Sequence, residues 1–362
     1  MNEGTQVSAV HAQERIPLPH NMENAASGGI FRLPGGRSGS EENRILKILQ
    51  PPAANPGAGT SAWPTSEAPD HFNYWRREVA AYESGFANSA FAEAGIRAPR
   101  LMAVETRADR SVELWLEDVD GRSGFELSVG RLGHFGHELG VGQARWVKRV
   151  PPAAELPWLS RRWLAQYVSG GPHSGVLISD ADWDSPIARV WSTRTRLSLR
   201  RLWKSRMSVL AAAEAFPRTL CHLDLWPANL IEDISGSSVL IDWAFVGEGA
   251  VGEDPANLII DSVTDGLIDI GQLPDILDAI CDGYVAGLSD GGWTGSADEV
   301  RAAIATCGAA KYSWLGALII ASAVRGATDG ASSDHNDAAA DDLERIRPLA
   351  ELLAEWSDSI DL

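Results

Sequence analysis

The sequence predicts an α+β protein of two lobes: a small N-lobe with an antiparallel sheet and one main helix, and a larger, mostly helical C-lobe. Short apolar runs typical of strands are concentrated before residue 117, and longer segments with helical periodicity follow residue 121. The chain has 362 residues, of which 44% are hydrophobic, so it is long enough and apolar enough to form two packed cores.

The expected N-lobe begins with two strands joined by a glycine-rich turn. Residues 1–26 show no clear period, and we interpret them as a loosely attached leader. From Ser27, the segment SGGIFRLPGG predicts a glycine turn, a short strand and a second turn. The segment ENRILKILQ, residues 42–50, then predicts a compact apolar strand. We therefore expect the N-lobe to occupy residues 27–116.

One helix and two more strands complete this lobe. Residues 51–70 are rich in Pro, Ala and Gly, which predicts a loop or flexible insert. A helix is expected over 71–84, where apolar side chains recur at spacings of three and four, namely Phe72, Trp75, Val79 and Tyr82. Strands are expected at 101–104 and 112–116. The segment EDVDG, residues 117–121, is then the expected hinge between the lobes.

The expected C-lobe, residues 122–362, is mostly helical with one strand-rich interruption at 222–243. Its longest helical patterns lie at 125–146, 191–215, 274–288 and 297–324. The tract ATDGASSDHNDAAADD, residues 327–342, has a composition typical of turns or mobile segments.

Charge and cysteine content limit the classes of partner. The formal net charge is −18, which disfavours nucleic acid and anionic membranes and makes a cationic or neutral small molecule easier to accommodate. The three cysteines show no CxxC spacing, so neither a zinc site nor a disulfide framework is indicated. The N-terminus lacks an apolar signal region. We expect a cytoplasmic protein.

The strongest chemical signal is CHLDLWPANLI, residues 221–231, followed by VLIDWAFVG, residues 239–247. Asp224 precedes Asn229 by five positions, so a short loop can direct both side chains into one site. Asp242 can join them from a neighbouring strand. Phosphoryl transfer uses such a set, because a carboxylate orients the nucleophile while hard oxygen ligands hold Mg²⁺ against the phosphates. The alternative is that these residues only cap turns.

These segments resemble the aminoglycoside phosphotransferase family, the small-molecule kinases related to choline kinases and, more distantly, to protein kinases. His222, Asp224 and Asn229 match the HxDxxxxN catalytic loop of that family, and Asp242 in IDW matches its metal-binding aspartate. The segment GEDPANL, residues 252–258, resembles the GDP-containing stretch that follows. The resemblance implies a two-lobed protein-kinase-like fold that uses ATP and Mg²⁺.

The same resemblance implies a role for each motif residue. Asp224 accepts or orients the proton of a substrate hydroxyl, His222 supports the loop, and Asn229 and Asp242 bind Mg²⁺. Two positions depart from the family: Leu223 stands where glycine is frequent, and Asn257 stands where aspartate commonly precedes leucine. Neither departure removes a proposed base or metal ligand.

The N-lobe contains the expected partners for ATP. Lys47 lies within the apolar strand ILKIL, where an ammonium needs a compensating anion. In a kinase it holds the α- and β-phosphates and pairs with a helix glutamate, for which Glu78 is the first candidate and Glu83 the second. The alternative for Lys47 is an edge-strand lysine that reaches water.

Two further segments are assigned to ATP by their order along the chain. Ser27, Gly28 and Gly29 are expected to form the turn over the phosphates, although a glycine pair between strands is also typical of a plain hairpin. The backbone from Glu117 to Val119 is expected to recognise adenine.

The leading functional hypothesis is transfer of the γ-phosphoryl group of ATP to a hydroxyl of an aminoglycoside-like or other antibiotic, or of an amino sugar. Residues that could contact such an acceptor are Trp226, Glu253, Asp254, Asp261 and Asp265, although the four acids could equally be helix-surface charges. One alternative is a metabolic kinase for choline, a sugar, homoserine or a nucleoside. The other is an inactive pseudokinase that only binds nucleotide.

Overall fold

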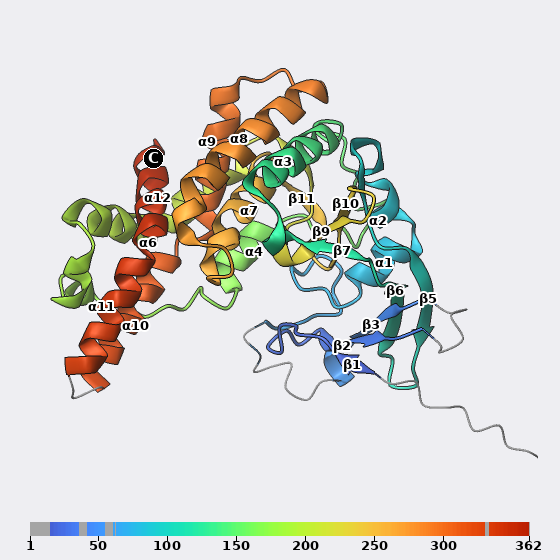
Figure 1. The fold of residues 1–362 in the computed structure, drawn as a ribbon, viewed down its shortest axis with the longest axis horizontal. Helices are drawn as coiled ribbons and strands as arrows, with labels where there is room; N and C mark the ends of the chain where they lie inside the picture. Colours follow the sequence, from blue (N-terminus) through green and yellow to red (C-terminus); the bar gives the residue numbers. More distant parts are fainter. Residues whose placement is uncertain (1–14, 36–41, 55–60, 62, 330–332, 362) are drawn as a thin grey trace, which may run out of the picture.

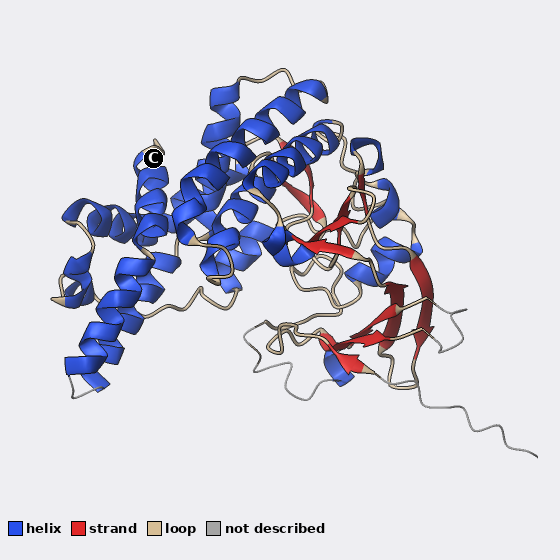
Figure 2. Cartoon of the chain, in the orientation of Figure 1, coloured by secondary structure: helices blue, strands red, loops and turns tan. Residues whose placement is uncertain are grey.

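The computed structural model describes residues 15–35, 42–54, 61, 63–329 and 333–361. Strands gather at one end of the molecule and long helices at the other, with mixed structure between them (Figure 1, Figure 2). The two-lobed α+β architecture expected from the sequence is therefore confirmed.

The N-lobe is built on a five-stranded sheet in the order β1-β2-β3-β6-β5, with every neighbouring pair antiparallel. Its strands are β1 (Ile16–Pro17), β2 (Ser27–Leu33), β3 (Arg44–Leu49), β5 (Leu101–Thr106) and β6 (Val112–Glu117). Strand β1 pairs with β2, so the sheet begins before the boundary expected at residue 27. Residues 1–14 of the expected leader lie outside the described residues.

The main N-lobe helix, α1 (Arg77–Glu83), packs behind the sheet and is shorter than expected. The apolar stripe is buried as predicted, with Val79 fully inaccessible and Phe72 3% exposed. The turns ahead of the helix are held by Arg77, whose guanidinium donates to the carbonyl oxygens of Pro69, His71 and Phe72. Those carbonyls fold back onto Arg77, so the helix starts there and not at residue 71. A short helix, α2 (Phe86–Ser89), follows.

A second, four-stranded sheet carries part of the site and has the order β4-β10-β9-β7. Its strands are β4 (Ile96–Arg97), β7 (Gly121–Ser123), β9 (Leu230–Asp233) and β10 (Ser238–Leu240). A separate pair is formed by β8 (Arg218–Cys221) and β11 (Gly247–Ala250). The strands confirm the predicted interruption at 222–243 and extend it in both directions.

The helices of the C-lobe are α3 (Val129–Ala144), α4 (Trp163–Gly170), α5 (Asp180–Trp183), α6 (Thr193–Glu214), α7 (Glu253–Thr264), α8 (Leu273–Asp290), α9 (Ala297–Lys311), α10 (Leu315–Asp329), α11 (Ser333–Arg345) and α12 (Arg347–Asp358). Short 3-10 turns lie at Pro52–Ala54, Ala92–Ala94, Gly124–Glu126, Ile187–Val190, Pro227–Asn229 and Ile270–Gln272.

Two expectations for the C-lobe were wrong: one long helix over 297–324 and a turn-like or mobile tract over 327–342. The single helix expected over 297–324 is divided into α9 and α10 by a turn at residues 312–314. The described part of the tract 327–342 is helical, because packing outweighs its composition: Leu343 near the end of α11 is 1% exposed. The stretch Ala297–Gly326 is long and apolar enough to cross a membrane, but 83% of its most apolar window is buried inside the protein, which is typical of core helices.

Helices α3 and α8 lie side by side and approach each other through glycines (Figure 1). A Cβ atom added at Gly283 would lie 2.0 Å from the carbonyl oxygen of Gly133, and one at Gly287 would lie 2.0 Å from that of His137. Only glycine permits backbones this close. These glycines therefore set the distance between α3 and α8, and both helices support the loop between β8 and β9.

We predict that Gly283→Ala and Gly287→Ala each lower the free energy of unfolding by about 2 kcal/mol, the scale of overpacking a tight core. The control is Gly130→Ala in α3, where an added Cβ meets no atom within 4 Å. It should leave stability unchanged or raise it slightly. Urea unfolding followed by circular dichroism measures all three, and equal midpoints would contradict the packing argument.

Candidate active site

The loop between β8 and β9 brings the motif residues of the C-lobe together. The Asn229 side-chain amide donates to the Asp224 backbone carbonyl at 2.8 Å and to the Asp224 carboxylate at 2.9 Å. Asn229 also receives a backbone hydrogen bond from Ile241, which places Asp242 beside the loop. The predicted association of Asp224, Asn229 and Asp242 is therefore present.

The backbone of this loop is held from below by Asp254 at the start of α7. Its carboxylate is fully buried and accepts the N–H groups of His222 at 2.7 Å and Leu223 at 2.8 Å. Leu223 has φ +68°, in the left-handed region that favours glycine. The backbone of Leu223 is thus strained, and Asp254 fixes its amide and the preceding one.

Two residues that the sequence analysis missed fix Asp254 in turn. Gln143 of α3 donates its amide N–H to Asp254 at 2.8 Å and accepts the Tyr284 hydroxyl of α8 at 2.5 Å. Tyr284 also accepts the backbone N–H of Gly252. A buried glutamine in an otherwise apolar helix face is the signal that could have singled out Gln143. The close α3–α8 contact therefore supports the loop through side-chain hydrogen bonds.

In the N-lobe, Lys47 of β3 bridges two carboxylates from different elements. Its ammonium lies 2.6 Å from Glu78 of α1 and 3.0 Å from Asp242. Burial alone would lower the pKa of Lys47, but these two negative charges outweigh it and hold the pKa above its usual value. Glu83, the second candidate for this pairing, is exposed and pairs with Arg76. Lys47 is therefore a charged residue of the interlobe cleft.

Asp242 faces the cleft under unusual backbone geometry. It has φ +60°, and its side chain remains 33% exposed. Burial would raise its pKa, but the neighbouring Lys47 ammonium outweighs burial and lowers it. Strained backbone at a cleft carboxylate is common at functional sites. Asp242 is thus ionised and accessible to a cation.

The Asp224 carboxylate lies in a different electrostatic environment. Burial, followed by the nearby charge of Asp242, raises the pKa of Asp224 to about 7. A carboxyl group with such a pKa can accept a proton near neutral pH. His222 is fully buried and its ring contacts the carbonyl oxygen of Ile241 at 3.0 Å, while burial lowers its pKa to about 4. His222 is therefore neutral and supports the loop.

A cavity lies between the lobes. This cavity, of about 210 Å³, is lined by the hinge residues Glu117 to Val119 on one side and by Lys47 and Asp242 on the other. Most of the remaining wall is apolar, from Leu18, Ile30, Ile45, Leu116, Ile231 and Ile241. The Glu117 side chain pairs with Arg97 at 3.0 Å. A smaller cavity of about 70 Å³ adjoins Lys47 and Glu78 and includes Ser27.

The prediction that Gly28 and Gly29 form a turn over the phosphates was wrong. Both lie inside β2, where a register shift between Ser27 and Gly29 marks a bulge and Gly29 has φ +125°. The segment that connects β1 to β2, residues 18–26, contributes to both cavities instead. The glycines permit the bulge and do not line either cavity.

The four acids expected at an acceptor site are in different environments. Asp261 of α7 accepts the Asn257 amide at 2.9 Å, and the same amide donates to the carbonyl oxygen of Leu225, beside Asp224. Glu253 is 3% exposed and accepts the backbone N–H of Ala250, while Asp254 is committed to the loop. Asp265 lies just past the end of α7 and is exposed. Of the four, only Asp261 adjoins the catalytic loop on its acceptor side.

Trp226 lies within the catalytic loop and is half-buried. Its ring packs edge-on against Phe125 at a centroid distance of 5.9 Å. Trp226 therefore borders the site and also holds the loop against the turn that leads into α3.

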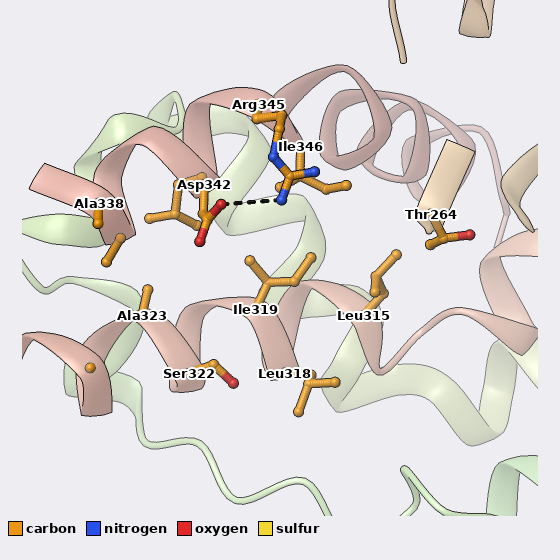
Figure 3. A pocket seen from close by; sticks show the side chains of 13 residues that line it. Thr264, Leu315, Leu318, Ile319, Ser322, Ala323, Ala338, Asp342, Arg345 and Ile346 are labelled. Carbon is orange, nitrogen blue, oxygen red and sulfur yellow. Dashed lines mark hydrogen bonds and ion pairs between the residues drawn. The ribbon is translucent and has the colours of Figure 1, made fainter. Parts of the chain in front are cut away.

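A larger cavity, of about 490 Å³, lies between α10 and α11 (Figure 3). Leu315, Ile319 and Ser322 of α10 line one side, the Asp342–Arg345 ion pair of α11 lies opposite, and Thr264 of α7 is at one end. The Thr264 hydroxyl donates to Asp261 at 3.3 Å. The cavity thus reaches the element that carries Asp261.

The donor set fits a divalent cation that is shared with phosphate. In the part of the chain that the structure describes, no group of three His, Cys, Asp or Glu side chains could hold a metal alone. Because the Asn229 amide nitrogen faces Asp224, its oxygen is directed to the other side, and the Asp242 carboxylate is accessible. Mg²⁺ typically takes one or two protein oxygens together with phosphate and water.

We predict that Asp254→Ala lowers the free energy of unfolding by at least ~2 kcal/mol, because two buried amides and the Gln143 amide lose their acceptor. Asp265→Ala, at the other end of the same helix and exposed, should change stability little. Equilibrium chemical denaturation compares the two variants. Equal stability would show that the Asp254 carboxylate does not hold the loop.

Several known proteins resemble this chain. The amicoumacin kinase hAmiN in complex with AMP-PNP, Ca²⁺ and Ami has a similar fold, with a TM-score of 0.52, 12% identity, and coverage of 95% of this chain and 88% of that one. For an aminoglycoside-3'-phosphotransferase of type VIII, the TM-score is 0.46 and the identity 19%, with coverage of 84% of this chain and 93% of that one. For an ethanolamine kinase from Plasmodium vivax, the TM-score is 0.46 and the identity 12%, with coverage of 92% of this chain and 82% of that one. No curated protein matches the sequence.

Residues 75–293 match the family described as "Phosphotransferase enzyme family". The match covers more than half of the chain and includes Glu78, the catalytic loop, Asp242 and α7. Together with the two-lobed fold and the clustered motif residues, it shows that the chain belongs to the phosphotransferase enzyme family.

Proposed function

We propose that this protein transfers the γ-phosphoryl group of ATP, with Mg²⁺, to a hydroxyl of a small molecule of the antibiotic or amino-sugar kind. The observation that carries the proposal is the position of the Asp224 carboxylate. It is held by Asn229, lies near Asp242 and has a pKa raised to about 7. This is the placement and basicity expected of a group that orients an attacking hydroxyl.

The other residues of the cleft serve ATP. When bound, Mg-ATP supplies the phosphoryl group and the positive charge that balances the transferred phosphate. Lys47 is set by Glu78 to hold the phosphates, and Asn229 and Asp242 offer oxygen atoms to the metal. The adenine ring fits the apolar cavity beside the hinge. Positioning and charge stabilisation thus account for most of the proposed catalysis.

We place the body of the acceptor in the cavity between α10 and α11, from which its hydroxyl would extend past Thr264 and Asp261 toward Asp224. The cavity volume of about 490 Å³ is in the range typical of pockets for drug-sized ligands. The amicoumacin kinase of similar fold is described in complex with AMP-PNP, Ca²⁺ and Ami, which supports a nucleotide together with a small-molecule acceptor. A cytoplasmic location, where ATP is available, and a role in resistance are part of the same proposal.

A pseudokinase is not favoured, because Lys47, Asp224, Asn229 and Asp242 are all present and lie together. A metabolic kinase would use the same machinery, so a panel of acceptors must decide between it and the antibiotic class. The panel should include aminoglycosides, other antibiotics, amino sugars, sugars, homoserine, nucleosides and choline.

We predict that Asp224→Ala lowers acceptor-dependent turnover by at least ~10²-fold while Mg-ATP binding persists, because the base touches the acceptor and not the nucleotide. Asp242→Ala should lose both turnover and affinity for Mg-ATP. A coupled assay for ADP and titration calorimetry separate the two variants. Wild-type turnover in Asp224→Ala would refute the assignment of the base.

We also predict that Ile319→Trp, at the centre of the α10–α11 cavity, raises the acceptor KM by about tenfold or more and leaves the ATP KM unchanged, since one lost apolar contact region is worth ~1.4 kcal/mol or more. Met207→Trp, an exposed position on α6, is the control. Unchanged acceptor kinetics in Ile319→Trp would place the acceptor elsewhere.

A further inference from the structure

Lys311, the last residue of α9, is a buried lysine next to the acceptor side of the catalytic loop. Its residue is 7% exposed. The ammonium lies 4.7 Å from the ring centroid of Trp163, 5.6 Å from that of Tyr312 and 5.8 Å from that of Tyr167. Three aromatic rings from α4 and from the α9–α10 turn therefore form a cage around one cation.

Lys311 has no other partner within the described residues. None of the hydrogen bonds or ion pairs between them includes its ammonium, whose nitrogen is not fully shielded although the residue as a whole is buried. A lysine ammonium that leaves water normally gains hydrogen-bond acceptors from the protein. Aromatic faces compensate for only part of the lost interactions with water. Three aromatic rings therefore surround the ammonium, but none of the described residues gives it an oxygen as a hydrogen-bond partner.

The cage is rigidly attached to the catalytic machinery. Trp163 and Tyr167 stack at 4.9 Å with an interplanar angle of 9°, and Phe245, three residues after Asp242, packs on Trp163 at 5.5 Å. Burial raises the pKa of Asp224 and of Asp261, and the positive charge of Lys311 acts in the opposite direction on both. The ammonium is therefore close to the carboxylate that orients the acceptor.

We propose that Lys311 is a specificity-determining residue of the acceptor site, whose ammonium fills the cage of Trp163, Tyr167 and Tyr312. The site then takes hydroxyl compounds that offer an oxygen acceptor to this ammonium, and it excludes alcohols with a quaternary ammonium group. This inference rests on the proposed function for the identity of the acceptor side. It goes beyond that function by naming the charge of the group beside the reacting hydroxyl.

The exclusion has a direct physical basis. A quaternary ammonium ligand seeks an aromatic cage of this kind, but here the protein's own cation occupies it. An entering cation would displace the lysine side chain and meet a like charge within the same low-dielectric space. Among the acids of α7, Asp261 is the one left to attract a cationic acceptor, because Glu253 and Asp254 are committed to backbone amides.

The test uses two probes that differ only in charge. Choline carries a trimethylammonium group, and its carbon isostere carries an uncharged tert-butyl group in the same position. Saturation-transfer NMR with Mg-AMP-PNP present measures the affinity of each probe for the full-length wild type, Lys311→Ala and Lys311→Met. Thermal melting checks that each variant is folded.

The wild type should bind choline no better than the isostere. Lys311→Ala empties the cage, so the affinity for choline relative to the isostere should rise about tenfold. In Lys311→Met the side chain still fills the cage, so this ratio of affinities should not change. A wild type that prefers choline overturns the proposal even if Lys311→Ala does not fold. Absence of a choline gain in folded Lys311→Ala, including no binding of either probe, also overturns it.

Because binding is measured and not transfer, this result is independent of the kinase assay. If the kinase assay refuted the role of Asp224, the proposal that Lys311 occupies the cage would still stand. Conversely, a choline-preferring wild type would leave phosphoryl transfer by Asp224 untouched.

Discussion

The structure depends on a single buried carboxylate, that of Asp254, beneath the catalytic loop. Burial raises its pKa to about 7, and the backbone amides of His222 and Leu223 act against that rise. These amides hold a leucine in the left-handed region, a conformation that a non-glycine residue adopts only when its surroundings determine it. The direction of the Asp224 side chain follows from this turn. Glycine contacts between α3 and α8, acting through Gln143 and Tyr284, place the carboxylate.

The cleft above this loop is short of positive charge. Lys47 neutralises only part of the negative charge of Glu78 and Asp242, and Asp224 adds another carboxylate nearby. Such a cluster is costly in isolation, because like charges repel strongly at low dielectric. A divalent cation with its phosphates would bring in the missing positive charge while Lys47 holds the phosphate oxygens. The arrangement is therefore better suited to a site loaded with metal and nucleotide than to an empty one.

Much of the site could be predicted from short motifs, because their spacing limits where a loop can direct its side chains. Asp224, Asn229 and Asp242 were singled out in this way. Lys47 was singled out because an ammonium lies in an apolar strand, and Glu78 from the resemblance to kinases; the structure brings all five together. The residues that depend on packing could not be predicted. Gln143, Tyr284 and Lys311 act through partners more than a hundred residues away, or through rings on other helices.

The errors have the same origin. Gly28 and Gly29 have the composition of a turn, but pairing of β2 with β3 draws them into a bulged strand. Residues 327–342 have the composition of a loop, yet burial of Leu343 stabilises α11. Glu253 and Asp254 resemble surface charges in sequence, and only the fold shows that their carboxylates face backbone amides. In each case, long-range contacts outweigh local preference.

The most direct test of the central claim is to identify the product by phosphorus NMR after incubating the protein with Mg-ATP and the acceptor panel. The account predicts a new phosphomonoester signal that appears with one acceptor class, in proportion to the ADP formed. Release of inorganic phosphate alone, or unchanged ATP with every acceptor despite measurable nucleotide binding, would contradict it.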